Sequence, residues 1–222
     1  MIKGIIFDLD GVLTDTAVLH FQSWQQIVKE LGINYTYLEN EKLRGLPRLA
    51  TLQAILKLKK PNLQLSNEQL IQLCDAKNEL YQTFLATEIN KDSLLPSIME
   101  FLTAAKKKEL KLAIASSSYN APLILKKLGI FDLFDYIVNP ADIKNGKPAP
   151  DIFIKAAEGI DLKTNECFAI EDAPSGLQAI KSAKMLAIAI THDSNEDFSS
   201  ADLILNSTAE LNLDNILEKF NA

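Results

Sequence analysis

The sequence has few cysteines and histidines and no excess of positive charge. Its 222 residues include 2 cysteines and 2 histidines, and the formal net charge is -6. Without a basic excess the chain cannot neutralise phosphates along a duplex, so we expect no nucleic-acid partner. Cys74 and Cys167 lie among apolar residues and form no CxxC pair, which predicts reduced packing residues and argues against a structural metal site.

Long apolar runs and common nucleotide motifs are also absent. No apolar stretch approaches membrane-spanning length, and the N-terminus lacks the basic, apolar and small-residue pattern of a signal peptide. We therefore expect a cytoplasmic protein that binds no membrane. We also expect a monomer. The patterns GxGxxG, GxxxxGK[ST] and GxSxG do not occur, which disfavours dinucleotide sites, Walker-type nucleotide sites and the nucleophile elbow of hydrolases.

The order of periodic segments predicts the fold. Residues 2–7 are apolar on both faces apart from Lys3, which is typical of a strand buried in a parallel sheet. Residues 15–90 show helical periodicity, and they are too long for an ordinary crossover connection. Helices and strands alternate from there to the C-terminus, which indicates a parallel sheet with helices on both faces.

The expected fold class is therefore α/β, a doubly wound parallel sheet with an inserted small helical cap domain. Residues 1–14 and 91–222 are expected to form the core domain, and residues 15–90 the cap. Two helix starts can be placed. Asp15 is expected to cap the first helix of the insert, and the segment beginning Ser66-Asn67-Glu68-Gln69 has the pattern of a capping box.

Carboxylates follow the first strand directly. Asp8 and Asp10 are two residues apart, so on extended chain their side chains point the same way and can share one pocket. Two like charges this close need a divalent metal or a proton, and both arrangements can serve acid–base chemistry. From these residues alone, a solvated turn built on Asp and Gly is an equal alternative.

Further polar groups are expected at the same sheet edge. Ser116 and Glu171-Asp172 follow predicted strands, and Lys147 lies in a loop fixed by glycine and two prolines. Carboxylates that bind Mg²⁺, with a lysine and a hydroxyl near the phosphoryl oxygens, suit phosphoryl transfer. Singly, these residues have structural interpretations: a surface lysine, a helix cap and a solvated turn. A serine nucleophile would need His20 and His192 to converge on Ser116, which we regard as the weaker hypothesis.

The motifs carry a family resemblance. The chain resembles the haloacid dehalogenase superfamily in four motifs, which occur in order as Asp8-Leu9-Asp10-Gly11-Val12, Ser116, Lys147-Pro148 and Glu171-Asp172. Along essentially its whole length it also resembles the β-phosphoglucomutase family, through Asp15-Thr16-Ala17 with His20 and Trp24, Leu43-Arg44-Gly45 with Arg48, and Lys77-Asn78. The resemblance implies a Rossmann-like core domain and a small helical cap.

The resemblance also implies roles. Asp8 would be the nucleophile that becomes an aspartyl phosphate, and Asp10 the general acid/base. Mg²⁺ would be held by Asp8, the Asp10 backbone carbonyl and Asp172, with Glu171 behind these ligands. Ser116 and Lys147 would hold the transferring phosphoryl group. The residues implied for orienting Asp10 and for binding the substrate and its distal phosphate are Thr16, His20, Trp24, Gly45, Arg48, Lys77, Ser118 and Asn120.

The implied reaction is a Mg²⁺-dependent phosphomutase step on a small sugar phosphate. β-D-glucose 1-phosphate would become glucose 6-phosphate through β-glucose 1,6-bisphosphate. Two alternatives remain open: a sugar-phosphate phosphatase, if the closed site admits water, and a phospho-acceptor signalling domain, which would need neither the helical insert nor Asp10. Tyr119 departs from the family, which usually has a basic side chain there, so Arg48 would be the main cation for the distal phosphate.

Overall fold

The computed structural model describes residues 1–43 and 46–221. The chain folds as two compact units: Met1–Asp15 together with Asn90–Ala222, called here the α/β unit, and Thr16–Ile89, called the helical unit. Each junction lies one residue from the boundary expected from the sequence, at 15/16 and at 89/90. Among the described residues, no helix is long and apolar enough to cross a membrane.

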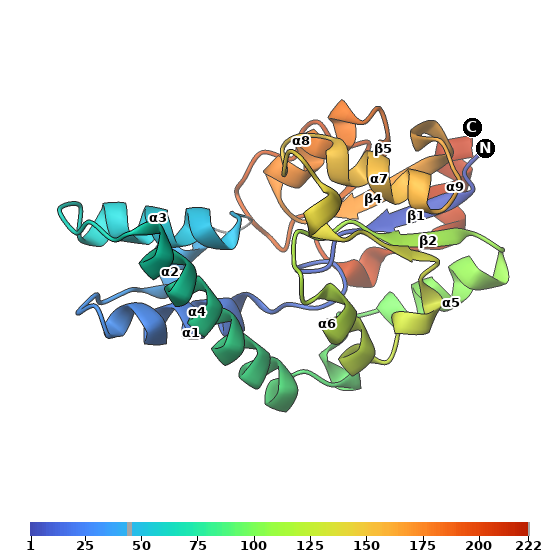
Figure 1. Ribbon diagram of the computed structural model, residues 1–222. Coiled ribbons are helices and arrows are strands. Elements are labelled where there is room, and N and C mark those ends of the chain that lie inside the picture. Colours follow the sequence, from blue (N-terminus) through green and yellow to red (C-terminus); the bar gives the residue numbers. More distant parts are fainter. Residues whose placement is uncertain (44–45, 222) are drawn as a thin grey trace. The chain divides into compact units, whose positions relative to one another are not determined.

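The α/β unit is built on a six-stranded sheet whose neighbouring strands are all parallel. The strand order is β3-β2-β1-β4-β5-β6, so β6 is an edge strand. Figure 1 shows β1 between β2 and β4. The strands are β1 (Gly4–Phe7), β2 (Lys111–Ile114), β3 (Tyr136–Ile137), β4 (Cys167–Glu171), β5 (Leu186–Ile190) and β6 (Leu203–Leu205).

Strand register brings the ends of three strands level. Phe7 pairs with Ile114 of β2 on one side and with Ile170 of β4 on the other. Because parallel strands leave the sheet at the same edge, the residues that follow β1, β2 and β4 emerge together, at the edge where ligands of such sheets bind. This edge carries the polar groups that the sequence placed at strand ends.

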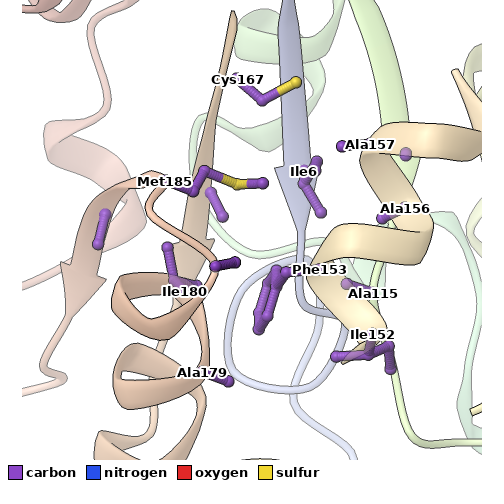
Figure 2. Packing of buried hydrophobic residues seen from close by; sticks show 14 of the residues in the cluster. Ile6, Ala115, Ile152, Phe153, Ala156, Ala157, Cys167, Ala179, Ile180 and Met185 are labelled. Atoms are coloured by element: carbon purple, nitrogen blue, oxygen red, sulfur yellow. The ribbon is translucent and has the colours of Figure 1, made fainter. Parts of the chain in front are cut away.

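Helices cover both faces of the sheet, because side chains alternate along each strand. On one face, α7 and α8 pack on a core that contains Ile6, and Figure 2 shows Phe153 and Ile180 gathered around it. On the other, Phe7 packs edge-on against Phe101 of α5. The helices are α5 (Ile98–Lys107), α6 (Ala121–Leu128), α7 (Asp151–Gly159), α8 (Pro174–Ser182) and α9 (Leu213–Asn221). The predicted doubly wound α/β class is confirmed.

Alanines allow these helices to approach the sheet. The strand residues on the α7/α8 face include Ala113, Ala169 and Ala187, all fully buried. Their small side chains leave room for the fully buried Phe153 ring, and burying an aromatic side chain contributes about 1.5–3 kcal/mol. The sheet and α7 are thereby held together directly below the edge where Asp8 emerges.

The helical unit is a bundle with its own core. Its helices are α1 (Ala17–Lys29), α2 (Tyr37–Glu41), α3 (Arg48–Lys59) and α4 (Asn67–Glu88). Buried residues from α1, α3, α4 and the segment after α1 form that core: Trp24, Val28, Ile33, Tyr35, Leu52, Ile55, Leu56 and Cys74. The capping box at Ser66 is confirmed, because its hydroxyl accepts from the Gln69 N–H at 3.2 Å while Gln69 Oε1 accepts from the Ser66 N–H at 2.9 Å.

The prediction that Asp15 caps the first helix of this unit is wrong. Thr16 is the N-cap residue of α1, and its side chain makes no cap hydrogen bond. The Thr16 hydroxyl is instead buried and lies 2.8 Å from the Tyr81 hydroxyl on α4. Tertiary contact between the two helices has therefore replaced local capping at this position.

Candidate active site

Buried polar residues lie at the carboxyl ends of β1, β2 and β4 in the α/β unit. Asp8 is 8% exposed, Ser116 4% and Glu171 2%. Sheet hydrogen bonding extends to the first of these residues, because the Asp8 N–H donates to the Ile170 carbonyl at 3.0 Å. The backbone at Asp8 is therefore fixed by the sheet before any side chain is considered.

Lys147 joins two of these carboxylates. Its Nζ lies 2.6 Å from Asp8 Oδ1 and 2.7 Å from Glu171 Oε2. The loop that carries it is held at its ends, since the Asn145 N–H and side-chain amide both donate to Asp151 Oδ1, at 3.2 and 3.1 Å. Lys147 is therefore paired with two buried carboxylates and is not a surface lysine, which was the structural interpretation left open by the sequence.

Charges in this cluster shift the ionisation of its members. Burial alone would lower the pKa of Lys147, but the Asp8 and Glu171 carboxylates outweigh it and raise that pKa. Burial raises the pKa of Glu171, the Asp8 charge raises it further, and the Lys147 ammonium offsets only part of this. Lys147 is therefore stabilised in its protonated, positively charged form. The Asp8 and Glu171 carboxylates, by contrast, share this one ammonium as their positive partner.

The acidic groups fit a divalent cation. Ligand oxygens of Asp8, Glu171 and Asp172 all lie within 4.8 Å of one another. Three carboxylates against the Lys147 ammonium leave a formal charge of −2, which a divalent ion would neutralise. Carboxylate oxygens are the donors that Mg²⁺ prefers. The Asp10 side chain is not part of this group, so the structure leaves its predicted backbone role as a prediction.

Two glycines allow carboxylates to lie against the backbone. Gly11 has φ +77°, and a Cβ there would lie 1.9 Å from Asp172 Oδ2. At Gly176, in the first turn of α8, a Cβ would lie 2.1 Å from Glu171 Oε2. Glu171 also accepts from the Ala173 N–H at 3.2 Å. Both acidic residues are thus placed by close approach to backbone that only glycine permits.

The serines after β2 form two successive turns. The Ser116 hydroxyl oxygen accepts from the Ser118 N–H at 3.1 Å, and the Ser118 hydroxyl oxygen accepts from the Asn120 N–H at 3.2 Å. Asn120 is buried at the N-cap of α6, while Tyr119 is 62% exposed. Accepting through oxygen orients each hydroxyl so that its own proton can be donated outward.

His192 was not predicted to take part in this site. Its Nε2 lies 2.6 Å from the Gly11 carbonyl oxygen, which can only accept, so Nε2 carries the proton. The Gly11 N–H donates to the Thr14 carbonyl at 2.7 Å. Both backbone polar groups of Gly11 are therefore hydrogen-bonded, which holds the loop after β1 at this residue. The two histidines occupy separate units, and His192 contacts this loop, so the structure offers no support for a serine nucleophile at Ser116.

Within the helical unit, the predicted cap residues cluster on α1 and α4. His20 Nδ1 lies 2.6 Å from Lys77 Nζ, and that ammonium also lies 5.5 Å from the centroid of the Trp24 ring. Thr16, His20 and Trp24 are four apart along the chain, so they lie on one face of α1. Tyr81 completes this cluster and was missed, although its position four residues after Lys77 on α4 was a usable signal.

The predicted distal-phosphate residues are divided between the units. Arg48 begins α3 in the helical unit, where its Nη2 donates to Asn78 Oδ1 at 2.8 Å. Ser118 and Asn120 belong to the α/β unit. Gly45 lies outside the described residues. The joint role of this set remains a prediction.

Comparisons with known proteins identify the family. The model of the haloacid dehalogenase-like hydrolases matches residues 2–184. β-Phosphoglucomutase of Bacillus subtilis is 39% identical over 218 residues, which cover 98% of this chain and 95% of that protein. The chain belongs to the β-phosphoglucomutase family of haloacid dehalogenase-like hydrolases. The predicted resemblance is thereby confirmed.

Solved structures and a second relative extend the comparison. The crystal structure of β-phosphoglucomutase from Clostridium difficile superposes with a TM-score of 0.93 at 36% identity, covering 100% of this chain and 98% of that one. A phosphorylated carbohydrates phosphatase of Thermotoga maritima is 28% identical over 197 residues, covering 87% of this chain and 88% of that protein. Membership of the family implies a divalent metal, which the Asp8, Glu171 and Asp172 carboxylates fit.

Proposed function

We propose that this protein is a Mg²⁺-dependent β-phosphoglucomutase that interconverts β-D-glucose 1-phosphate and glucose 6-phosphate through β-glucose 1,6-bisphosphate. The observation that carries the chemistry is the buried contact of Asp8 with Lys147, in a carboxylate cluster that fits a divalent cation. The choice of mutase is supported by 39% identity along 98% of the chain to a protein of that name.

The residues divide the chemistry as follows. A carboxylate oxygen of Asp8 attacks phosphorus, and the bond from phosphorus to the sugar oxygen breaks. Asp10 gives that oxygen its proton, and takes a proton from the attacking hydroxyl when the phosphoryl group returns to sugar. Lys147 and Ser116 stabilise the charge on the phosphoryl oxygens. Bound Mg²⁺ would supply further neutralisation of these oxygens and of the Asp8 carboxylate, held by Asp8, Asp172 and the Asp10 carbonyl, with Glu171 nearby.

The helical unit supplies substrate binding in this proposal. Thr16, His20 and Lys77 orient Asp10, and Arg48 binds the distal phosphate with Ser118 and Asn120. A mutase must keep its aspartyl phosphate from water until a sugar phosphate arrives, which is a reason for a domain that covers the site during turnover. Trp24 and Gly45 complete the proposed substrate-binding set.

A sugar-phosphate phosphatase is the second candidate. It is favoured by the 28% identical phosphatase relative of Thermotoga maritima, and it would use the same Asp8 chemistry with water as the final acceptor. The lower identity makes it the weaker candidate. In either case we propose a monomer that acts on a small sugar phosphate in the cytoplasm.

One assay separates the two. The protein is incubated with Mg²⁺, β-glucose 1-phosphate and a catalytic amount of the bisphosphate, and glucose 6-phosphate is followed against free phosphate. Glucose 6-phosphate formed in large excess over free phosphate would support the mutase. Free phosphate formed in an amount equivalent to the substrate consumed would support the phosphatase instead. Product without a requirement for Mg²⁺ would contradict the metal assignment.

Two variants of the loop after β1 test the roles within it. Asp8→Asn should abolish both turnover and covalent phosphorylation, because an amide is not a nucleophile. Asp10→Asn should retain metal binding and lower turnover by about 10²- to 10⁴-fold, the usual contribution of a general acid/base. Covalent phosphorylation of the Asp8→Asn protein would place the nucleophile at another residue. A turnover of Asp10→Asn within about tenfold of wild type would show that Asp10 is not the general acid/base.

A further inference from the structure

One aromatic side chain contacts three of the residues proposed to orient Asp10. Tyr81 on α4 is fully buried, and its hydroxyl lies 2.8 Å from the Thr16 hydroxyl. The His20 ring stacks on the Tyr81 ring with centroids 4.1 Å apart and planes inclined by 22°. Lys77 Nζ lies 4.4 Å from the centroid of the same ring. The proposed mechanism assigns no role to Tyr81.

We propose that Tyr81 is a positioning residue that fixes the orientation and tautomer of His20. The consequence for catalysis rests on the proposed function, whereas the effect on the His20–Lys77 pair does not. In this proposal Tyr81 acts on the reaction only through His20, so it is a positioning residue and not a catalytic one.

The contact between His20 and Lys77 determines which imidazole nitrogen carries the proton. An ammonium has three donors and no acceptor, so at 2.6 Å from Lys77 Nζ the His20 Nδ1 accepts. The proton of the neutral ring then lies on Nε2. Protonating Nδ1 as well would place two cations in direct contact. His20 therefore presents an Nε2–H donor on the edge of the ring away from Lys77.

This arrangement requires Lys77 to remain an ammonium although it is only 2% exposed. A buried charge is costly unless neighbouring groups stabilise it. The faces of Tyr81 and Trp24 lie within 5.5 Å of Nζ and supply cation–π attraction, which is stronger where water is excluded. The Tyr81 ring thus contacts both partners of the pair: it stacks on the His20 ring, and its face attracts the Lys77 ammonium.

The Tyr81 hydroxyl adds a second contact between α4 and the start of α1. Thr16 and His20 are one turn apart on α1, and Lys77 and Tyr81 are one turn apart on α4. The bond from Tyr81 to Thr16 and the bond from Lys77 to His20 therefore connect the same two helical turns. Removing the ring should free the His20 imidazole to rotate, while removing only the hydroxyl should leave the stack in place.

Nitrogen-15 spectra of the histidines test the inference directly. The chain has 2 histidines, so labelled protein shows only two imidazoles, and a His192→Asn variant assigns them. At neutral pH, wild-type His20 should show protonated Nε2 and unprotonated Nδ1. Tyr81→Phe should keep this pattern, and Tyr81→Leu should shift His20 to a mixture of tautomers. His192, in the α/β unit, serves as the internal reference.

A matched variant controls for loss of core packing. Leu85 lies one turn further along α4 and is also fully buried, so Leu85→Ala damages the same helix without touching the stack. It should lower stability and leave the His20 tautomer unchanged. An unchanged tautomer in Tyr81→Leu, or an equal shift in Leu85→Ala, would overturn the proposal.

Kinetics provide the second measurement. Tyr81→Leu should lower kcat for the sugar phosphate by about 10²-fold, the loss expected when a reacting group is displaced by about 1 Å, with a smaller change in KM. Phosphorylation of Asp8 by a small acyl phosphate should stay near the wild-type rate. Equal losses in both reactions would overturn the positioning role. The tautomer experiment does not depend on mutase activity, so failure of the proposed function and failure of this inference are distinguishable.

Discussion

At the scale of single residues, the site depends on groups that hold the acidic side chains as much as on the acids themselves. Glu171 is bounded by Lys147, by the Ala173 N–H and by the bare Cα of Gly176. Such packing leaves the buried carboxylate little freedom to move. A small change in one of these neighbouring groups should therefore alter turnover.

Gly176→Ala should therefore lower the activity of the protein without unfolding it. Alanine is favoured over glycine in a helix by about 1 kcal/mol, but its Cβ would lie 2.1 Å from Glu171 Oε2 and force this carboxylate away from Lys147. We expect turnover to fall by about tenfold or more while the melting temperature is kept, because displaced groups lose catalytic geometry.

Gly146→Ala is the matched control for this variant. A Cβ at Gly146 meets nothing within 4 Å, although the residue adjoins Lys147. Its turnover should stay within about twofold of wild type, as for ordinary surface substitutions. Wild-type turnover in Gly176→Ala would show that Glu171 can move without consequence.

His192 provides a second test at this scale. Its hydrogen bond to the Gly11 carbonyl holds the loop that carries Asp8 and Asp10, and a hydrogen bond of this kind contributes about 1 kcal/mol. His192→Ala should lower kcat by roughly fivefold with KM little changed. His192→Gln retains a side-chain N–H donor and should recover part of the loss. A change confined to KM would instead place His192 in substrate binding.

At the scale of elements, Asp135 fastens the segment before β3 to its neighbours. Its Oδ2 accepts from the Leu112 N–H on β2 at 2.8 Å and from Lys106 Nζ of α5 at 3.1 Å. Lys111 Nζ lies 3.2 Å from Oδ1. Burial opposes ionisation, but these donors outweigh it and hold the pKa of Asp135 below its ordinary value.

This shift predicts a pH-dependent contribution to stability. A carboxyl with a lowered folded-state pKa stabilises the fold above its unfolded value, about 3.9, and loses the contribution as the pH falls through the folded-state pKa. Asp135→Asn should lower the free energy of unfolding by about 1 kcal/mol at pH 7, a value reduced by partial exposure of the side chain.

Urea unfolding at pH 7 and pH 3 measures this effect. The difference between wild type and Asp135→Asn should shrink at the lower pH. Asp132→Asn, at an exposed position three residues earlier, is the control and should change little at either pH. A difference that did not depend on pH would assign the loss to packing and not to charge.

At the scale of the whole molecule, each unit contains one buried cysteine, which reports on its unfolding. Cys74 lies in the core of the helical unit and Cys167 in the core of the α/β unit. Burial raises the pKa of Cys167 to about 12 and raises that of Cys74, where the Arg48 charge opposes it in part. Both thiols should therefore be inert in the native protein at pH 8.

In increasing urea, Cys74 should react with a thiol reagent before Cys167. The helical unit is half as long as the α/β unit, and shorter domains bury a smaller fraction of their surface. Mass spectrometry of the labelled peptides distinguishes the two sites. Simultaneous labelling at every urea concentration would show that the two units unfold as one cooperative body.

Local features were readable from the sequence because they depend on neighbouring residues. The apolar strand ahead of Asp8, the capping box at Ser66 and the alternation of helix and strand follow from side-chain periodicity and short-range hydrogen bonding. The motif residues also indicated the family without coordinates. Strand order then placed Asp8 and Glu171 at one edge, as expected for parallel neighbours.

Tertiary structure alone decided the contacts between distant residues. Lys147 reaches Asp8 across 139 positions, and His192 reaches Gly11 across 181, distances over which no sequence period operates. The Thr16 hydroxyl pairs with Tyr81 on another helix and does not cap its own, because burial requires each polar group to find a partner wherever packing brings one. The sequence by itself thus determined which chemical groups this protein has and on which local elements they lie, whereas the pairing of those groups came only from how the elements pack.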